Sequence, residues 1–161
     1  MTGTHSTTAL LVAVAGPPET GPMTQQLWRR DPNSSGRPSP RTFIRVFAEP
    51  GGLEGSVAFY ERLLGTECDM RMPYPEKNLA LAAVGSFLVI EGTEEALQPF
   101  RETTGTLLVD DVEPYLRRLR DGGAEIIHPP VDVPSGRSFT ARHPDGTLVE
   151  YVHHRPAEHE R

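Results

Sequence analysis

The second half of this chain repeats the pattern of the first half at a nearly constant offset. Two stretches with the apolar spacing of a helix end at Gly65 and Gly123, which lie 58 residues apart. Two glycines between strand-like apolar runs, Gly85 and Gly146, lie 61 residues apart. Glycine commonly follows the last turn of a helix and forms tight turns, so the two pairs mark equivalent places in successive units. The chain therefore contains two structural units of similar length.

Each unit contains a strand, a helix and three further strands. Runs rich in β-branched and aromatic residues, such as TFIRVFA at 42–48 and TLVEYVH at 147–153, predict strands, and SVAFYERLLG at 56–65 has helical spacing. One such unit cannot close a hydrophobic core alone, whereas two units side by side leave a cupped inner face. We predict an α+β fold of two tandem βαβββ modules, residues 42–92 and 104–153, that form a cupped, barrel-like mixed sheet with the helices outside.

The two ends of the chain differ in composition from the repeat. Residues 1–41 contain six prolines among Ser, Thr and Gly, which disfavour helix and strand pairing, so we expect a flexible, disordered tail. The apolar run 9–15 is not preceded by Lys or Arg and is too short to span a membrane, so we expect no export signal. Met23 is an alternative start to Met1. Residues 154–161 are expected to form a polar C-terminal tail after a domain at 42–153.

Charge and cysteine content exclude some classes of function. The chain has 16 basic and 22 acidic residues, a formal net charge of −6 and no basic cluster. Nucleic acid is therefore not expected as a partner, because phosphate binding requires clustered Lys or Arg. A single cysteine, Cys68, excludes an intrachain disulfide and fits a reducing compartment, so we expect a cytoplasmic protein with no membrane partner.

Three stretches carry a family resemblance: SVAFYERLLG, LLVDDVEPYLRRLRDGGAEII and SGRSFTARHPDGTLVEYV. Together they resemble the glyoxalase, bleomycin-resistance and extradiol-dioxygenase superfamily, also called vicinal oxygen chelate proteins. The last stretch is the most specific, because this family usually ends in a polar-aromatic strand, an Asp-Gly turn and a strand that contains Glu. The resemblance implies the cupped fold over residues 42–153. Members isomerise substrates, open rings, inactivate antibiotics or sequester them, so the fold alone does not name a function.

In the metal-using members that this chain resembles, four ligands line the cup, typically His, Glu or Gln. The fourth ligand position falls on Glu150, four residues after Gly146 in the closing strand. The first position falls near Arg45, whose guanidinium cannot be deprotonated in a protein and is no metal ligand.

The remaining two ligand positions also lack good ligands. The second position falls on Val89, with Glu91 as a weak alternative on the same strand face. The third falls on Thr104, or on Thr103 or Gly105 if the register slips. We therefore expect no metal site and no cofactor, with Glu150 as a weak metal candidate. The alternative is a divalent ion such as Zn, Ni, Fe or Mn.

Arg45 and Glu150 occupy two positions that converge in the family fold. We expect them to form a buried ion pair across the cup or to flank a polar ligand, because each satisfies the charge of the other. Two versions stay open: the pair is purely structural, or Arg45 binds an anionic or carbonyl-bearing ligand. The predicted ligand-binding residues are Arg45, Phe47, Thr104, Thr106, Phe139, Arg142, Glu150 and Tyr151.

The resemblance and these residues together suggest a function. We expect a metal-free small-molecule binding protein of the bleomycin-resistance type, which sequesters a hydrophobic or aromatic metabolite or antibiotic. Members of this type are generally homodimers, so a homodimer is expected. The alternative is a divalent-metal-dependent lyase, isomerase or dioxygenase of the same superfamily, and the residues assign no catalytic group.

Overall fold

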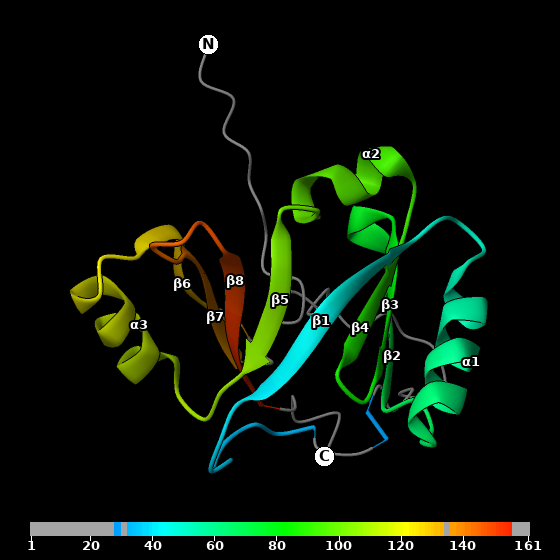
Figure 1. Cartoon of the computed structure of the whole chain (residues 1–161), viewed down its shortest axis with the longest axis horizontal. Coiled ribbons are helices and arrows are strands. Elements are labelled where there is room, and N and C mark those ends of the chain that lie inside the picture. The colour runs from blue at the N-terminus through cyan, green and yellow to red at the C-terminus, as the bar shows by residue number, and fades with distance from the viewer. Residues whose placement is uncertain (1–27, 30–31, 134–135, 156–161) are drawn as a thin grey trace.

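The computed structural model describes residues 28–29, 32–133 and 136–155, and its elements follow the predicted order (Figure 1). The first module contains β1 (Arg41–Ala48), α1 (Leu53–Leu64), β2 (Met70–Tyr74), β3 (Leu79–Val84) and β4 (Phe87–Glu91). The second contains β5 (Thr103–Leu108), α3 (Val112–Asp121), β6 (Glu125–Val133), β7 (Gly136–Arg142) and β8 (Leu148–His154). Between the modules lie α2 (Glu94–Leu97) and the short 3-10 helix η2 (Gln98–Phe100), and a second 3-10 helix, η1 (Pro75–Lys77), precedes β3.

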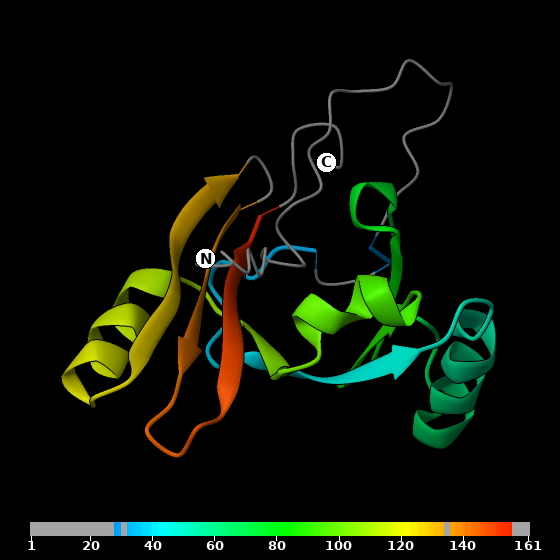
Figure 2. The same cartoon turned by 90° about the horizontal axis from the view of Figure 1, so that it is seen from above.

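The strands form one mixed sheet in the order β2-β3-β4-β1-β5-β8-β7-β6. β1 pairs in parallel with β4, β5 pairs in parallel with β8, and β1 meets β5 antiparallel at the junction of the modules. The sheet curls into an open U (Figure 2). The predicted α+β fold of two βαβββ modules around a cupped sheet is confirmed. The sheet does not close into a barrel, because β2 and β6 remain its two outer strands.

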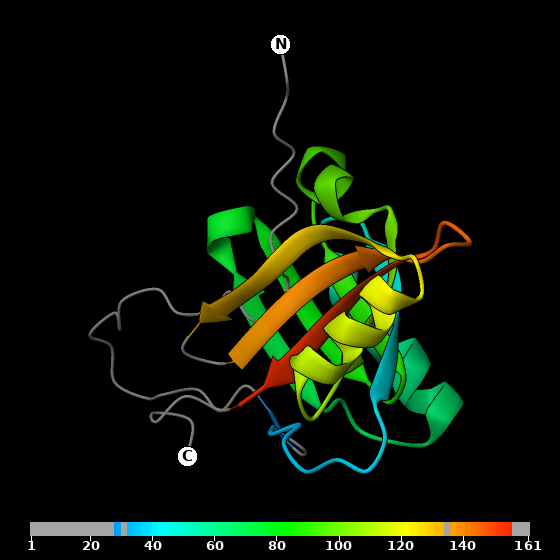
Figure 3. The same ribbon diagram turned by 90° about the vertical axis from the view of Figure 1, so that its left-hand side faces the viewer.

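Helices α1 and α3 cover the outer, convex face of the sheet, one on each module (Figures 1 and 3). Val57 of α1 packs against Ala82 and Val84 of β3. Leu116 of α3 packs in a cluster with Val149 of β8. None of the helices in the described part of the chain has the length and apolar character needed to cross a membrane.

The concave face of the sheet, which we call the cup, is lined by buried apolar side chains. On β3, Leu81 and Ala83 alternate with Ala82 and Val84, which face α1, so the first pair faces the cup. The same buried cluster draws side chains from both modules and from the α2–η2 link. Its members are Trp28, Phe43, Met70, Met72, Tyr74, Leu79, Leu81, Ala83, Leu88, Ile90, Leu97, Phe100, Leu108 and Val152.

Part of the predicted N-terminal tail packs against the domain. Trp28 and Ser34 are buried, and Trp28 belongs to the cup cluster. At the other end, β8 continues to His154, which is buried as well. These contacts correct the predicted boundaries at residues 41 and 154, because single buried side chains extend the packed part beyond the repeat. Residues 1–27 and 156–161, for which tails are predicted, lie outside the described residues.

Candidate functional site

A buried ion pair lies at the junction of the two modules. The side chains of Arg45 on β1 and Glu150 on β8 are each 2% exposed, and Nη2 of Arg45 lies 3.5 Å from Oε1 of Glu150. Nε of Arg45 donates a hydrogen bond of 3.1 Å to Oγ1 of Thr106 on β5. The predicted ion pair is confirmed by these contacts, which connect three adjacent strands.

Strand register places these side chains together on the cup face. Arg45 lies two residues after Phe43, which belongs to the cup cluster, and residues two apart on a strand share a face. Thr106 of β5 and Thr140 of β7 pair directly with Glu150 from either side. Directly paired residues have neighbouring side chains on one face of a sheet, so the three form a polar group in the second module.

The guanidinium of Arg45 is incompletely hydrogen-bonded. Burial lowers the pKa of Arg45 and the nearby Glu150 carboxylate raises it in part, while the group remains charged. Its Nη1 atom is buried and has no hydrogen-bond acceptor among the described residues. Oγ of Ser138, which lies two residues before Thr140 and shares its face of β7, is also buried without a partner in the described ranges. Two buried polar atoms on the cup face therefore lack a hydrogen-bond partner among the described residues.

Tyr74 faces the cup from β2 and is absent from the predicted site. Burial raises the pKa of its phenol, and the negative charges of Glu76 and Glu150 raise it further. Tyr74 belongs to the same buried cluster as Phe43 and Leu108, which lie on the strands of Arg45 and Thr106. Pro73 makes this stretch look like a turn, but proline is tolerated in an outer strand such as β2, and the alternation of buried and exposed residues continues through it.

A family model described as Glyoxalase/Bleomycin resistance protein/Dioxygenase superfamily matches residues 46–151. The chain belongs to this superfamily. An uncharacterized protein from Methanosarcina mazei with a solved structure is 42% identical, over 73% of this chain and 94% of that chain, with a TM-score of 0.65. Methylmalonyl-CoA epimerase from Mycobacterium tuberculosis is 18% identical over 76% of this chain and 92% of its own, with a TM-score of 0.52, which shows likeness of fold alone. A comparison with curated proteins found no match.

The described residues do not fit the metal site of this superfamily. In the sheet, Arg45 pairs with Leu88 of β4, and Thr106 pairs with Glu150 of β8, so these four cup positions contain one carboxylate. The cation of Arg45 already lies beside that carboxylate. Across the described ranges, no group of three or more His, Cys, Asp and Glu side chains is arranged to hold a metal ion.

The second ligand position, predicted at Val89, falls on Leu88 in the structure. Leu88 and Ile90 belong to the cup cluster, so Val89 between them faces the convex side. Glu91 shares the face of Val89, and its Oε2 accepts a hydrogen bond of 2.8 Å from the backbone N–H of Leu53, the first residue of α1. Glu91 therefore caps a free backbone amide at the start of α1 and does not serve as the alternative second metal ligand.

Phe139 and Tyr151 do not line the cup, which corrects their predicted placement there. Their rings stack with centroids 4.9 Å apart and pack in the cluster beneath α3 with Leu116. Tyr151 directly follows Glu150, and adjacent strand residues point to opposite faces of the sheet. The phenol of Tyr151 forms a hydrogen bond of 2.7 Å with Nε2 of His143 instead.

The two predicted threonines have different surroundings. Thr106 is fully buried on the cup face. Thr104 is exposed, and its Oγ1 donates to the carbonyl oxygen of Leu148 at 3.3 Å. A register shift between Thr103 and Gly105 turns Thr103 inward, where it is buried. The irregularity explains the error for Thr104, because regular alternation does not hold across it.

Phe47 and Arg142 lie at partly exposed ends of their strands. Phe47 packs against the cup cluster, and the guanidinium of Arg101 lies 5.2 Å from the centre of its ring. Arg142 is near Glu102, with 3.9 Å between Nη2 and Oε2, and donates to the carbonyl oxygen of Gly146. Both are positioned to contact a molecule that enters the cup, and their role in binding stays a prediction.

Proposed function

We propose that this chain is a small-molecule binding protein of the bleomycin-resistance type, which holds a hydrophobic or aromatic metabolite or antibiotic in the cup without a resident metal ion. The observation that carries this proposal is Nη1 of Arg45, a buried donor on a charged group without an acceptor among the described residues. Leaving such a donor unpaired is costly. An oxygen atom of a bound molecule would supply the missing acceptor.

The charge of the site favours a neutral ligand group. Glu150 already lies 3.5 Å from Nη2 of Arg45, so the pair carries no net charge. A carboxylate or phosphate would add a second negative charge to a buried space, which is expensive. A carbonyl oxygen can accept from Nη1 without adding charge. We therefore infer that the ligand presents a ketone, amide or quinone carbonyl to Arg45.

The surrounding side chains orient this contact. Thr106 and Glu150 hold Nε and Nη2 of Arg45, which directs Nη1 independently of the ligand. Oγ of Ser138 offers a second polar contact, and Met72 and Leu81 belong to the apolar lining. Small-molecule sites commonly combine a mainly apolar wall with a few placed polar groups. Binding of this kind sequesters the compound and needs no chemical step.

Nile red, a neutral aromatic dye with a ring carbonyl and an emission that increases in apolar surroundings, tests this proposal. The protein is expected to bind the dye, and Arg45→Met is expected to weaken binding by about 10- to 150-fold, because a hydrogen bond to a charged group contributes roughly 1.5–3 kcal/mol. Arg120→Met is a matched control, since Arg120 is exposed in the last turn of α3. Equal affinities for the wild-type protein and Arg45→Met would overturn the proposal.

Two further measurements separate loss of binding from loss of folding or of a metal. The double variant Arg45→Met/Glu150→Leu removes both charges and should fold, yet bind Nile red as weakly as Arg45→Met. Elemental analysis of protein purified without a histidine tag should show no stoichiometric Zn, Ni, Fe or Mn. A stoichiometric ion would favour the divalent-metal lyase, isomerase or dioxygenase in place of a metal-free binding protein.

A further inference from the structure

Trp28 lies inside the cup, although it precedes the first strand by many residues. It is 3% exposed and belongs to the apolar cluster of the cup. Its backbone forms an isolated antiparallel bridge with Met70, the first residue of β2. Its ring centre lies 5.2 Å from that of His154, the last residue of β8, with the ring planes tilted by 39°.

These two contacts show that Trp28 spans the hollow of the sheet. Four strands, β3, β4, β1 and β5, separate β2 from β8 in the sheet order. Neighbouring strands are about 4.8 Å apart, so one residue can reach both β2 and β8 only where the sheet curls around it. The indole, which packs in the cup cluster, therefore lies between the β2 side and the β8 side of the curled sheet, where a ligand of the cup would bind.

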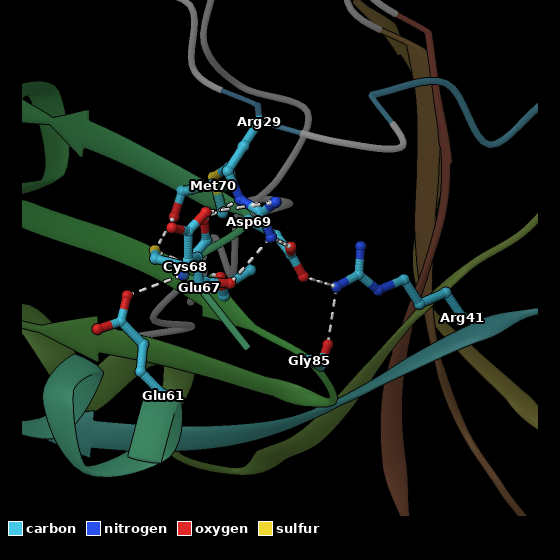
Figure 4. Close-up of polar contacts among 9 residues, drawn as sticks. Arg29, Arg41, Glu61, Glu67, Cys68, Asp69, Met70 and Gly85 are labelled. Atoms are coloured by element: carbon cyan, nitrogen blue, oxygen red, sulfur yellow. Dashed lines mark hydrogen bonds and ion pairs between the residues drawn. The ribbon is translucent and has the colours of Figure 1, made fainter. Parts of the chain in front are cut away.

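Arg29 fastens this residue to the edge of the first module (Figure 4). Its backbone N–H donates to the carbonyl oxygen of Asp69 at 2.6 Å, and its Nε donates to the carbonyl oxygen of Cys68 at 2.9 Å. Its Nη2 lies 2.8 Å from Oδ1 of Asp69, whose side chain is fully buried. We call residues 28–29 with these contacts the strap.

The strap can separate from the sheet without leaving a buried charge unpaired. Asp69 keeps a second arginine partner, because Nη2 of Arg41 lies 2.5 Å from its Oδ2 and also donates to the carbonyl oxygen of Gly85. The side chain of Arg29 is already 42% exposed and gains water when it is released. The only regular pairing between Trp28 and a strand, among the described residues, is the single bridge to Met70.

We propose that Trp28 is an internal occupant of the aromatic subsite of the cup, and that a planar aromatic ligand binds there by displacing the strap. This inference rests on the proposed function and names the ligand class that the cup accepts. A flat ring fits because the space already holds an indole, which packs in the cup cluster with Met70 and has its ring centre 5.2 Å from that of His154. His154 lies four residues beyond Glu150 on β8, about 13 Å along the strand, so the aromatic subsite and the Arg45 anchor are at separate places along one wall.

The strap lowers the apparent affinity for a ligand, because only the fraction of molecules with an open subsite can bind. Trp28→Ala removes the competing ring and is expected to tighten Nile red binding at least about tenfold, while Trp28→Phe stays near the wild-type affinity. Arg29→Ala is expected to tighten binding as well, without any change in the cup lining. Arg71→Ala is the matched control, because Arg71 is similarly exposed, pairs with Glu54 and lies on the other face of β2.

Trp28 is the single tryptophan of the chain, so its emission reports the position of the strap. Saturation with Nile red should shift the emission maximum of the wild-type protein to longer wavelength and increase quenching by acrylamide. Arg29→Ala should show part of this shift without ligand. These changes would support displacement even if Trp28→Ala failed to fold.

The failure of this inference differs from the failure of the proposed function. Binding that depends on Arg45 but leaves Trp28 emission unshifted, with equal or weaker affinity in Trp28→Ala and Arg29→Ala, would overturn the strap alone. That result would show that the indole of Trp28 stays in the cup when the ligand binds. No Nile red binding by the wild-type protein, Trp28→Ala or Arg29→Ala would overturn the proposed function and the strap with it.

Discussion

Replacing Arg45 and Glu150 singly and together should have opposite effects on stability. Each side chain is 2% exposed, and the charged atoms lie 3.5 Å apart. Arg45→Met leaves the Glu150 carboxylate buried without this cation, and Glu150→Leu leaves a buried guanidinium whose Nη1 has no acceptor among the described residues. Removal of one partner from a buried pair typically costs about 3–5 kcal/mol. Each single variant should therefore lose a large part of the ~5–15 kcal/mol by which domains of this kind are stabilised.

The double variant Arg45→Met/Glu150→Leu should recover that stability. It removes both charges and fills similar volumes with apolar side chains, next to an apolar cluster that contains Phe43 and Leu108. Replacement of a complete buried pair in this way is often neutral or stabilising by about 1–4 kcal/mol. The free energy of unfolding of the double variant should thus be at least that of the wild-type protein, and the coupling between the two sites should amount to several kcal/mol.

Urea unfolding of the four proteins, followed by circular dichroism and by the emission of Trp28, measures these differences. A loss of less than about 1 kcal/mol in each single variant, with the two losses adding in the double variant as for a solvent-exposed pair, would contradict a buried ion pair. That result would mean that water reaches the guanidinium, and the unpaired Nη1 would no longer support a ligand at this place.

Three other perturbations follow from the packing. Asp69→Asn should lower the free energy of unfolding by about 3 kcal/mol or more in urea titrations, because its fully buried carboxylate pairs with two arginines. Gly65→Ala should lower the free energy of unfolding by roughly 1–2 kcal/mol, because the φ of Gly65 is 62°. Gly136→Ala should lower it clearly more, since a Cβ there would lie 1.9 Å from a backbone carbonyl oxygen. Thermal unfolding of the two variants measures the difference. Iodoacetamide should modify Cys68 more slowly than free cysteine at the same mildly alkaline pH, because burial raises the pKa of the thiol. The raised pKa also favours the folded state while the thiol is protonated. This contribution to the free energy of unfolding is present at neutral pH and is lost as the pH rises through the raised pKa.

The repeat made the overall architecture predictable. Gly65 ends α1 with a left-handed conformation, and Gly85 and Gly146 have positive φ in the turns before β4 and β8, so both glycine pairs mark equivalent places in the two modules. Positive φ strongly favours glycine, which makes such landmarks visible in a sequence. The family resemblance, in contrast, is what predicts that Arg45 and Glu150 converge in the cup, where their charged atoms lie 3.5 Å apart.

The face of each strand was less predictable than the strands themselves. An apolar run such as LVEYV does not show which residues face the cup when a helix covers the other side, since both faces are buried. The prediction that both Glu150 and Tyr151 lie in the cup is therefore half right, because adjacent strand residues face opposite sides. The irregular register between Thr103 and Gly105 likewise explains why the predicted cup residue Thr104 is exposed and Thr103 is buried. Trp28 was missed for a different reason: its surroundings in the chain are rich in proline and polar residues, and its partners Met70 and His154 are distant in sequence.

The cup is polar on one module and apolar on the other, which orients any molecule that binds in it. On the cup face, the buried polar side chains of Thr106, Ser138, Thr140 and Glu150 belong to the second module. The buried cup residues of β2, β3 and β4 are apolar apart from the phenol of Tyr74. Arg45 lies on β1 next to β5, at the boundary between these walls. A ligand with a carbonyl at one edge of an aromatic ring would match this division, with the carbonyl directed toward the second module and the ring packed against the first. A symmetric hydrocarbon would leave Nη1 of Arg45 unpaired, so the cup should bind it more weakly than a ketone of the same size.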